Sequence, residues 1–272
     1  MSFKSKINTY AKANHIAAQV VLQNYMIERF LIRLSNSEYK YNFVIKGGVL
    51  VAAIAGLDVR STMDLDTTVN NLPMSETQII KIIKKICSID INDDIVFEIK
   101  SISPIRKDDI YGGLCIRIDA IYNKIVTPIS LDITTGDVIT PSAVEYSIKG
   151  IFGENIKLFG YNIETLLAEK IETILSRGIY NTRAKDFYDV YLLATTQKYS
   201  KAGLSEALVA TSIHRDSYNN IHNSQEILKA INNSTDLLLL WNKYRKSFSY
   251  ASKIEYSSIM DVLRKIMNNN NF

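Results

Sequence analysis

Signals for β-strands are confined to the first half of the chain, and this segregation is the strongest constraint on the fold. Period-two alternation and short β-branched or aromatic runs predict strands at residues 41–45, 60–70, 95–101, 114–122 and 126–134. Beyond Gly160 the periodic segments have helical spacing instead, at residues 163–177, 182–196, 205–213, 224–231, 235–248 and 254–267. The sequence therefore predicts an α+β chain in which a mixed α/β half is followed by a helical half.

Helical spacing also occurs within the first half, at residues 1–34, 49–55 and 76–88. The last of these segments is preceded by Ser75, which together with Gln78 resembles a capping box. The change from strand-like to helical periodicity falls near residues 150–160. We therefore expect one domain over residues 1–155 and a second, helical domain over residues 156–272.

Composition excludes several classes of protein. The chain is 47% apolar, and its longest apolar stretch, residues 49–57, is about half of what a membrane span requires. The N-terminal residues lack the apolar core of a signal peptide, so we expect a cytoplasmic protein with no membrane partner. Two cysteines and three scattered histidines offer neither a disulfide framework nor a zinc spacing. We therefore look for the chemistry among the carboxylates.

The excess positive charge lies in the last third of the chain. The net charge is +4, and residues 197–272 contain ten Lys or Arg against six Asp or Glu. This distribution fits a polyanionic partner and fits a solvated helical surface equally well. Among these cations, Trp241, Tyr244 and Phe248 have the spacing of a helical core stripe, so we expect them in the core.

Two aspartates lie two residues apart on a predicted strand. Asp64 and Asp66 leave the same face of that strand, where two carboxylates 4 Å apart repel by about 4 kcal/mol at an effective dielectric of 20. A third carboxylate, Asp132, lies on residues 129–134, and the three converge if the two strands are neighbours. Oxygen ligands with open positions favour Mg²⁺ or Mn²⁺, ions that commonly act on phosphate. The alternative is exposed strand charge.

Gly47 and Gly48 join a predicted strand to a predicted helix. Unpaired backbone N–H groups and the helix dipole at such a turn suit an anion, and the missing Cβ lets a phosphate approach the backbone. The chain contains neither a Walker A loop nor a Rossmann fingerprint. A tight turn that requires positive φ is the alternative interpretation.

The helical half contains one lysine on an apolar stripe. Lys170 follows Leu166 and Leu167 at helical spacing, so its ammonium group needs either an anion or a route to solvent along the helix edge. Arg183, Asp186 and Asp189 follow at intervals of three residues, which an exposed ladder of salt bridges also explains.

These motifs, taken in order, resemble the AbiEii-type toxins of abortive-infection and type IV toxin–antitoxin systems, which belong to the nucleotidyltransferase superfamily. The resemblance spans residues 16–193. It rests on Lys46-Gly47-Gly48, on Arg60-Ser61-Thr62-Met63-Asp64-Leu65-Asp66, on Asp132, on Leu167-Ala168-Glu169-Lys170, and on Arg183-Ala184-Lys185-Asp186-Phe187-Tyr188-Asp189-Val190-Tyr191.

The resemblance implies a polymerase-β-like nucleotidyltransferase domain with a mixed sheet, joined to a helical domain that completes the nucleotide cleft. It implies a phage-defence toxin that transfers a nucleoside monophosphate from a nucleoside triphosphate, GTP or a pyrimidine nucleotide, with Mg²⁺ or Mn²⁺ as cofactor. Relatives modify the 3′ end of tRNA, so tRNA is the expected RNA acceptor. A cognate antitoxin encoded alongside is implied as a partner.

The resemblance also assigns roles to individual residues. It implies that Asp64, Asp66 and Asp132 are metal ligands. The implied catalytic residues are these three aspartates, Lys170 and Asp186. The implied nucleotide-binding residues are Lys46, Gly47, Gly48, Ser61, Thr62, Lys170, Arg183 and Asp189. Gly48 departs from the pattern, because much of the superfamily has Ser at this position; backbone N–H groups, Lys46 or Ser61 would then compensate for the missing hydroxyl.

Two other classes of function stay open on the residues alone. One is a non-catalytic module that senses a nucleotide or binds RNA, and the other is an interaction protein whose carboxylates are surface charges. The three intact carboxylates favour an enzyme.

Overall fold

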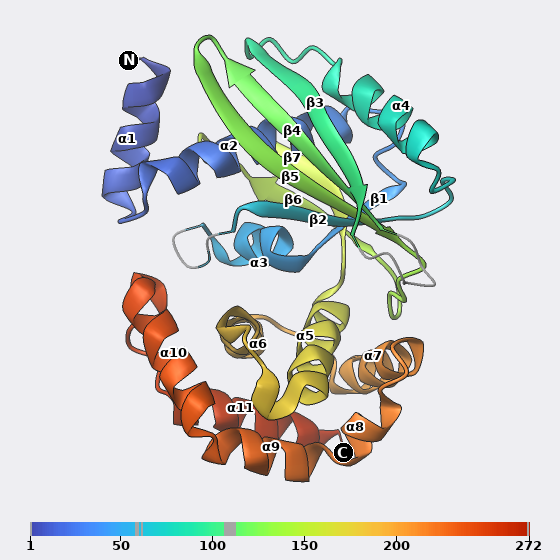
Figure 1. Ribbon diagram of the computed structural model, residues 1–272, viewed down its shortest axis with the longest axis vertical. Coiled ribbons are helices and arrows are strands. Elements are labelled where there is room, and N and C mark those ends of the chain that lie inside the picture. The colour runs from blue at the N-terminus through green and yellow to red at the C-terminus, as the bar shows by residue number, and fades with distance from the viewer. Residues whose placement is uncertain (1, 58–59, 61, 106–112, 271) are drawn as a thin grey trace. The chain divides into compact units, whose positions relative to one another are not determined.

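The computed structural model describes residues 2–57, 60, 62–105, 113–270 and 272 (Figure 1). The chain divides into two compact units. We call Met1–Asp137 with Val144–Gly160 the sheet unit, and Val138–Ala143 with Tyr161–Phe272 the helical unit. The predicted α+β chain, with a mixed sheet and a helical second half, is confirmed.

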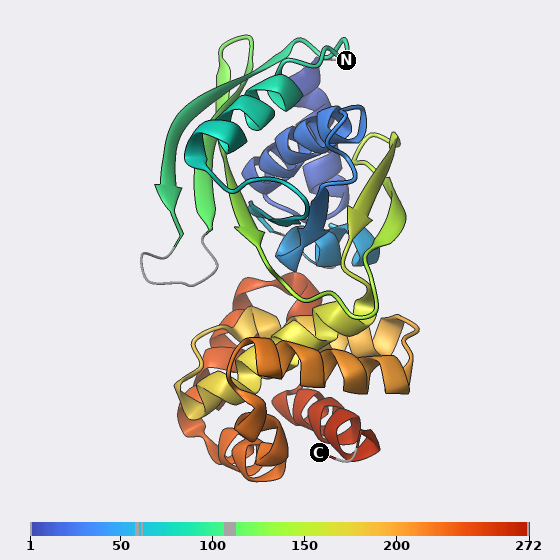
Figure 2. The same ribbon diagram turned by 90° about the vertical axis from the view of Figure 1, so that its right-hand side faces the viewer.

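The sheet unit is built on a sheet that has seven strands in the described part of the chain, in the order β3-β4-β5-β2-β1-β7-β6 (Figure 2). β2 pairs in parallel with β5 and β1 with β7, whereas the other neighbours are antiparallel. The strands are β1 Phe43–Lys46, β2 Asp64–Val69, β3 Ile95–Pro104, β4 Leu114–Tyr122, β5 Ile125–Thr135, β6 Val144–Lys149 and β7 Asn155–Gly160.

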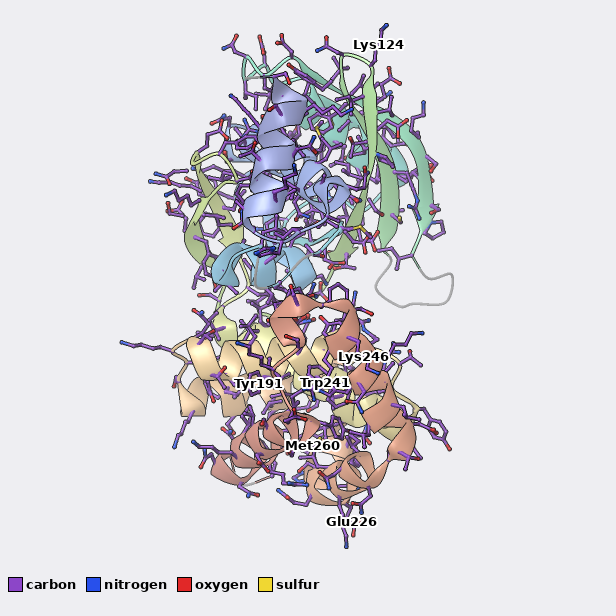
Figure 3. All side chains as sticks on the ribbon, turned by 90° about the vertical axis from the view of Figure 1, so that its left-hand side faces the viewer. Lys124, Tyr191, Glu226, Trp241, Lys246 and Met260 are labelled. Atoms are coloured by element: carbon purple, nitrogen blue, oxygen red, sulfur yellow. The ribbon has the colours of Figure 1, made fainter. Side chains whose placement is uncertain are left out.

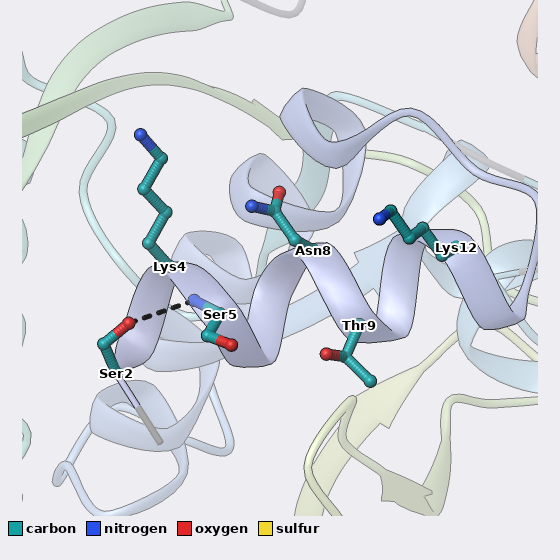
Figure 4. Close-up of a pocket in the computed structure, with 6 residues that line it drawn as sticks. All are labelled: Ser2, Lys4, Ser5, Asn8, Thr9 and Lys12. Carbon is teal, nitrogen blue, oxygen red and sulfur yellow. Dashed lines mark hydrogen bonds between the residues drawn. The ribbon is translucent and has the colours of Figure 1, made fainter.

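Four helices accompany the described strands: α1 Phe3–Ala13, α2 Ala18–Ser35, α3 Gly47–Ala55 and α4 Glu76–Cys87. Serine caps two of them: the Ser2 hydroxyl accepts a hydrogen bond from the Ser5 amide of α1 (Figure 4), and Ser75 does the same for Gln78 of α4, as predicted. α2 and α4 pack on the sheet and on each other, and bury apolar residues such as Phe30 and Ile83. α3 follows β1 directly and contacts β1 and β2.

β6 and β7 are not predicted from the sequence. Residues 156–160, assigned above to the helical domain, form most of β7 in the sheet unit. β6 alternates apolar and polar residues, but both strands are only six residues long. β7 joins β1 through a parallel pairing, Ile45 with Gly160, that no local pattern encodes.

The helical unit contains α5 Ile163–Arg177, α6 Ala184–Thr196, α7 Lys201–His214, α8 Tyr218–His222, α9 Ser224–Asn233, α10 Thr235–Ser247 and α11 Tyr256–Asn269. The six predicted helices are confirmed, whereas the five-residue α8 is too short for a periodic signal and is not predicted. Trp241 is buried as expected, and its indole N–H donates to the Ile254 carbonyl at 3.1 Å (Figure 3). In the described residues no helix combines the length and the apolar character that crossing a membrane requires.

Candidate active site

Strand pairing brings the predicted carboxylates together on the sheet. β2 lies between β1 and β5, so that Asp66 is opposite Lys46 on one side and opposite Asp132 on the other. Asp64 is opposite Ser130. Side chains that are paired across neighbouring strands share a face of the sheet, and residues two apart on one strand do too. The two aspartate strands are neighbours, which meets the condition set in the sequence analysis, and Asp64, Asp66 and Asp132 lie on one face.

The three carboxylates differ in exposure. Asp64 is exposed, whereas Asp66 and Asp132 are half-buried. The Oδ1 atom of Asp132 is buried and has no hydrogen-bond partner among the described residues. On β4, Cys115 faces Asp132. Burial, together with a side-chain hydrogen bond to Asp132 and the Asp132 charge, raises the pKa of its thiol, although the contact with Ser130 opposes the shift. A buried carboxylate oxygen without a donor is costly, so Asp132 favours an incoming cation or hydroxyl.

These residues suit a divalent cation in their chemistry. The donor set consists of carboxylate oxygens, which Mg²⁺ and Mn²⁺ prefer, and the unpartnered oxygen of Asp132 supplies a site for one. Within the described ranges, no three His, Cys, Asp or Glu side chains are already arranged to hold a metal ion. The residues therefore fit such an ion, although they form no closed cluster of three ligands.

The glycine turn lies directly beside Asp66. Gly47 begins α3 with φ +62°, and a Cβ built on it would overlap the Asp66 carboxylate. A Cβ on Gly48 would lie 2.8 Å from Thr62 Oγ1 and 3.2 Å from Arg60 Nη2. Both glycines are thus needed for close approach, and the positive φ of Gly47 agrees with the tight-turn interpretation as well. Thr62, which the resemblance implies as a nucleotide-binding residue, lies at the turn, whereas Ser61 lies outside the described residues.

Two residues at the turn were missed in the sequence. Arg60 is buried, with 4% of its surface exposed, and reaches Gly48. Asp137 accepts hydrogen bonds from Lys46 Nζ at 2.6 Å and from Thr134 Oγ1 at 2.5 Å. Asp137 lies three residues beyond a predicted strand, at the end of the sequence Thr-Thr-Gly-Asp. This position in a turn is the one sequence signal that indicates it.

Helix α2 holds the segment that leads into β2. The Asn24 side-chain amide donates to the Thr62 carbonyl at 2.7 Å. The Gln23 amide donates to the Met63 carbonyl at 3.1 Å and to the Pro128 carbonyl at 3.3 Å. These bonds tie the approach to Asp64 to the approach to Asp132, because Pro128 belongs to β5.

The helical unit contains a second, buried cluster of predicted site residues. Lys170 Nζ on α5 lies 3.1 Å from Asp186 Oδ1 and 2.7 Å from Asp189 Oδ2, both on α6. Arg183 Nε lies 2.7 Å from Asp186 Oδ2. Lys170 is 9% exposed, and Asp186 and Asp189 are 1% and 0% exposed. The expectation that Lys170 needs an anion is confirmed. The ion pair of Arg183 with Asp186 in the salt-bridge ladder is present, but both aspartates are buried, so the ladder is not exposed as predicted. The route of Lys170 to solvent along the helix edge is wrong, because the lysine is enclosed.

A surface hollow on α1 is lined by Ser2, Lys4, Ser5, Asn8, Thr9 and Lys12 (Figure 4). It contains no carboxylate and none of the residues singled out in the sequence. We therefore place the candidate site at the glycine turn and the carboxylates of β2 and β5.

Comparison with known proteins identifies the family. The sequence matches the family model described as nucleotidyl transferase AbiEii toxin, type IV toxin–antitoxin system, over residues 29–263. No match was found among curated proteins.

Solved structures share the fold. JHP933 from Helicobacter pylori is 16% identical, with a TM-score of 0.53 and 94% of each chain covered. A candidate nucleotidyltransferase from H. pylori is also 16% identical, with a TM-score of 0.53, and the match covers 94% of this chain and 98% of that one. Because the identity is low, these likenesses show the fold alone. The family model, in contrast, spans most of the chain. The chain therefore belongs to the AbiEii family of nucleotidyl transferase toxins of type IV toxin–antitoxin systems.

Proposed function

We propose that the protein is a metal-dependent nucleotidyltransferase toxin that transfers a nucleoside monophosphate from a nucleoside triphosphate to the 3′ end of a tRNA. The observation that carries this proposal is the register of Asp66 with Asp132 beside the Gly47 turn, with one Asp132 oxygen buried and unpartnered among the described residues. In the proposed reaction the acceptor hydroxyl attacks the α-phosphorus, a new P–O bond forms, and the bond to the departing pyrophosphate breaks.

Asp64, Asp66 and Asp132 would hold Mg²⁺ or Mn²⁺. When bound, such an ion neutralises phosphate charge and favours ionisation of the attacking hydroxyl. Asp132 Oδ1 has the further role of accepting the proton of that hydroxyl, since this atom lacks a donor among the described residues. Asp64 is the exposed member of the three and is therefore the one that an incoming hydrated cation would meet first.

The glycine turn supplies the phosphate contacts of the sheet unit. The first N–H groups of α3 have no partners within the helix and are available to an anion. Thr62 Oγ1 and the Arg60 guanidinium lie beside Gly48, where the wider superfamily has a serine hydroxyl. We propose that these two groups compensate for it, in addition to the backbone N–H groups.

The charged cluster of the helical unit has a related role in the proposal. Asp186 and Asp189 fix the ammonium group of Lys170, which we propose as a phosphate ligand. The side chain of Arg183 is 42% exposed and is the cation of this cluster that a phosphate in solution reaches most readily. Positioning by fixed charges is the main source of rate enhancement in phosphoryl transfer.

The basic surface of the helical unit supports RNA as the acceptor. Lys246 of α10 is exposed (Figure 3). Lys243 on the same helix and Lys253 in the next loop are exposed too. A polyanion gains affinity from such cations by releasing counterions, so binding should weaken with salt. Nucleoside triphosphates and tRNA are cytoplasmic, and the proposal therefore implies a cytoplasmic protein. The toxin–antitoxin family implies a cognate antitoxin that opposes the activity.

The proposal is tested by incubating the protein with each labelled nucleoside triphosphate, Mg²⁺ and total RNA. We expect label at the 3′ end of RNA of tRNA size, loss of labelling with a chelator, and recovery when Mg²⁺ is restored. Binding of a nucleotide without release of pyrophosphate would support a nucleotide sensor instead. Labelling of a protein band with no labelled RNA would overturn the tRNA acceptor.

A further inference from the structure

We propose that Asp137 is a positioning residue for nucleotide transfer, because its carboxylate holds Lys46 at the head of the Gly47–Gly48 turn. The inference rests on the proposed function, and it assigns a role to a residue outside the AbiEii-like motifs described above.

The contacts of Asp137 connect three strands. Its Oδ2 atom accepts from Lys46 Nζ of β1 at 2.6 Å and from Thr134 Oγ1 of β5 at 2.5 Å. Thr134 Oγ1 also lies 3.2 Å from the Thr67 carbonyl of β2. The side chains of Lys46 and Asp137 are only 13% and 17% exposed, so solvent screens the pair weakly. One carboxylate oxygen thus fixes the end of β5 to the end of β1.

The end of β1 is where the site is most sensitive to displacement. Lys46 directly precedes Gly47, whose Cα lies so close to the Asp66 carboxylate that no Cβ fits. Lys46 is also opposite Asp66 in the sheet register. A shift of Lys46 therefore moves both the Gly47 backbone and the surroundings of Asp66. Displacements of about 1 Å can cost on the order of 100-fold in rate.

The carboxyl group of Asp137 is charged at neutral pH. Burial by itself would raise the pKa of Asp137. The Lys46 charge, together with hydrogen bonds from Lys46, Thr134 and Thr68, outweighs burial and holds that pKa below its usual value. Removing the charge of Asp137 would take this counterion away from the enclosed Lys46 ammonium group, and the lysine would then shift toward another anion.

The test compares Asp137→Asn with a matched control. Asn keeps the size of the side chain and an oxygen for Thr134, but lacks the charge. Asp93→Asn breaks a similarly buried pair of the same unit, Arg33 with Asp93 at 2.7 Å, next to β3 at the edge of the sheet. We expect Asp137→Asn to lower kcat/KM for the triphosphate by about tenfold or more, the size of a lost charged hydrogen bond. Asp93→Asn should lose stability and stay within about twofold of wild-type kcat/KM.

A double variant distinguishes positioning through Lys46 from an independent effect. If Asp137 acts through Lys46, then Lys46→Met with Asp137→Asn is no worse than Lys46→Met alone. Multiplied losses would overturn the inference, as would a folded Asp137→Asn variant with wild-type kcat/KM.

Calorimetry with a non-hydrolysable triphosphate compares the binding affinities of wild type, Asp137→Asn and Asp93→Asn. This measurement tests the pair of Lys46 with Asp137 even if no nucleotide is transferred. If the wild-type protein binds the analogue but transfers no nucleotide, the proposed function is overturned. The inference about Asp137 still holds in that case if Asp137→Asn binds the analogue about tenfold more weakly than the wild type. A wild type that does not bind the analogue would overturn both.

Discussion

The sheet unit and the helical unit each enclose a group of aspartates, but they treat the negative charge in opposite ways. In the helical unit Asp186 and Asp189 are fully buried and contact Lys170, and Asp186 also contacts Arg183. In the sheet unit Asp132 has an oxygen that is buried and unpartnered among the described residues, and Asp64 is exposed. The helical unit pairs its buried aspartates with its own cations, whereas we propose that the sheet unit takes up a cation from solution.

This difference separates two kinds of charged cluster that a sequence cannot distinguish. A cluster with built-in counterions needs no ligand for its stability and rigidifies the helices that contribute to it. A cluster with an unpartnered oxygen gains stability when a ligand binds. The substitutions below should therefore affect activity at the carboxylates of β2 and stability at the cluster of α5 and α6.

The largest effect should come from Asp64→Asn. We expect nucleotide transfer to fall by about 10³-fold or more, because several kcal/mol of charge stabilisation are lost, while the unfolding free energy changes little at this exposed position. Glu98→Gln is the matched control, since Glu98 is also an exposed strand carboxylate of this sheet. Measurable transfer by purified Asp64→Asn near the wild-type rate would show that the β2 carboxylates are surface charge.

The complementary substitution is Lys170→Met. It leaves Asp186 and Asp189 buried without their lysine, so we expect the unfolding free energy to fall by about 3–5 kcal/mol in urea denaturation. We also expect weaker nucleotide binding by calorimetry. Adding Asp186→Asn and Asp189→Asn should recover part of the stability but not the affinity. Unchanged affinity in a folded Lys170→Met variant would limit this cluster to a structural role.

Glu28 of the sheet unit shows how burial changes the pKa of a carboxyl group when nearby positive charge does not outweigh it. Burial raises the pKa of Glu28 to about 7, although the Ile151 amide and the Arg29 charge oppose the shift. Between about pH 4.5 and 7, the Glu28 carboxyl group is ionised in the unfolded chain but keeps its proton in the folded chain. The unfolding free energy should therefore fall as pH rises, by up to about 3 kcal/mol at 1.4 kcal/mol per pKa unit. Denaturation of Glu28→Gln across this range should give a flatter profile, and an equal slope in both proteins would contradict the shift.

The last substitution, Gly47→Ala, places a Cβ where it overlaps the Asp66 carboxylate. The positive φ alone costs about 1–2 kcal/mol with a Cβ present. Gly153 has φ +93°, and a Cβ built on it would meet no atom within 4 Å among the described residues, so Gly153→Ala imposes strain without a clash. Transfer should fall strongly in Gly47→Ala, which displaces Asp66, and stay near wild type in Gly153→Ala. Equal activity in the two variants would contradict a role for the Gly47–Asp66 contact.

The local part of the fold was predictable from the sequence. Helices such as α5 follow from periodicity, and α4 also from its serine cap, because both signals arise within a few residues of the chain. The convergence of Asp66 and Asp132 was predictable only as a condition, since alternation determines the face of a strand but not its neighbour.

The missed features depend on contacts between distant residues. Lys46 and Asp137 are separated by 91 positions, and nothing near Asp137 identifies its partner. Lys170 was recognised as needing an anion, but the identity of that anion depends on how α5 packs against α6. Arg60 was quoted within a motif, and only the short approach to Gly48 gives it a role.

Under the proposed mechanism, the pairing of β2 with β5 also sets an early limit on when the protein can become toxic during its synthesis. Asp64 and Asp66 leave the ribosome well before Asp132, because β3 and β4 are translated in between. At about 5–20 residues per second, the interval between these aspartates lasts roughly 3–13 seconds. A nascent chain in that interval, or a fragment that terminates within it, lacks the third carboxylate and is harmless under the proposed mechanism.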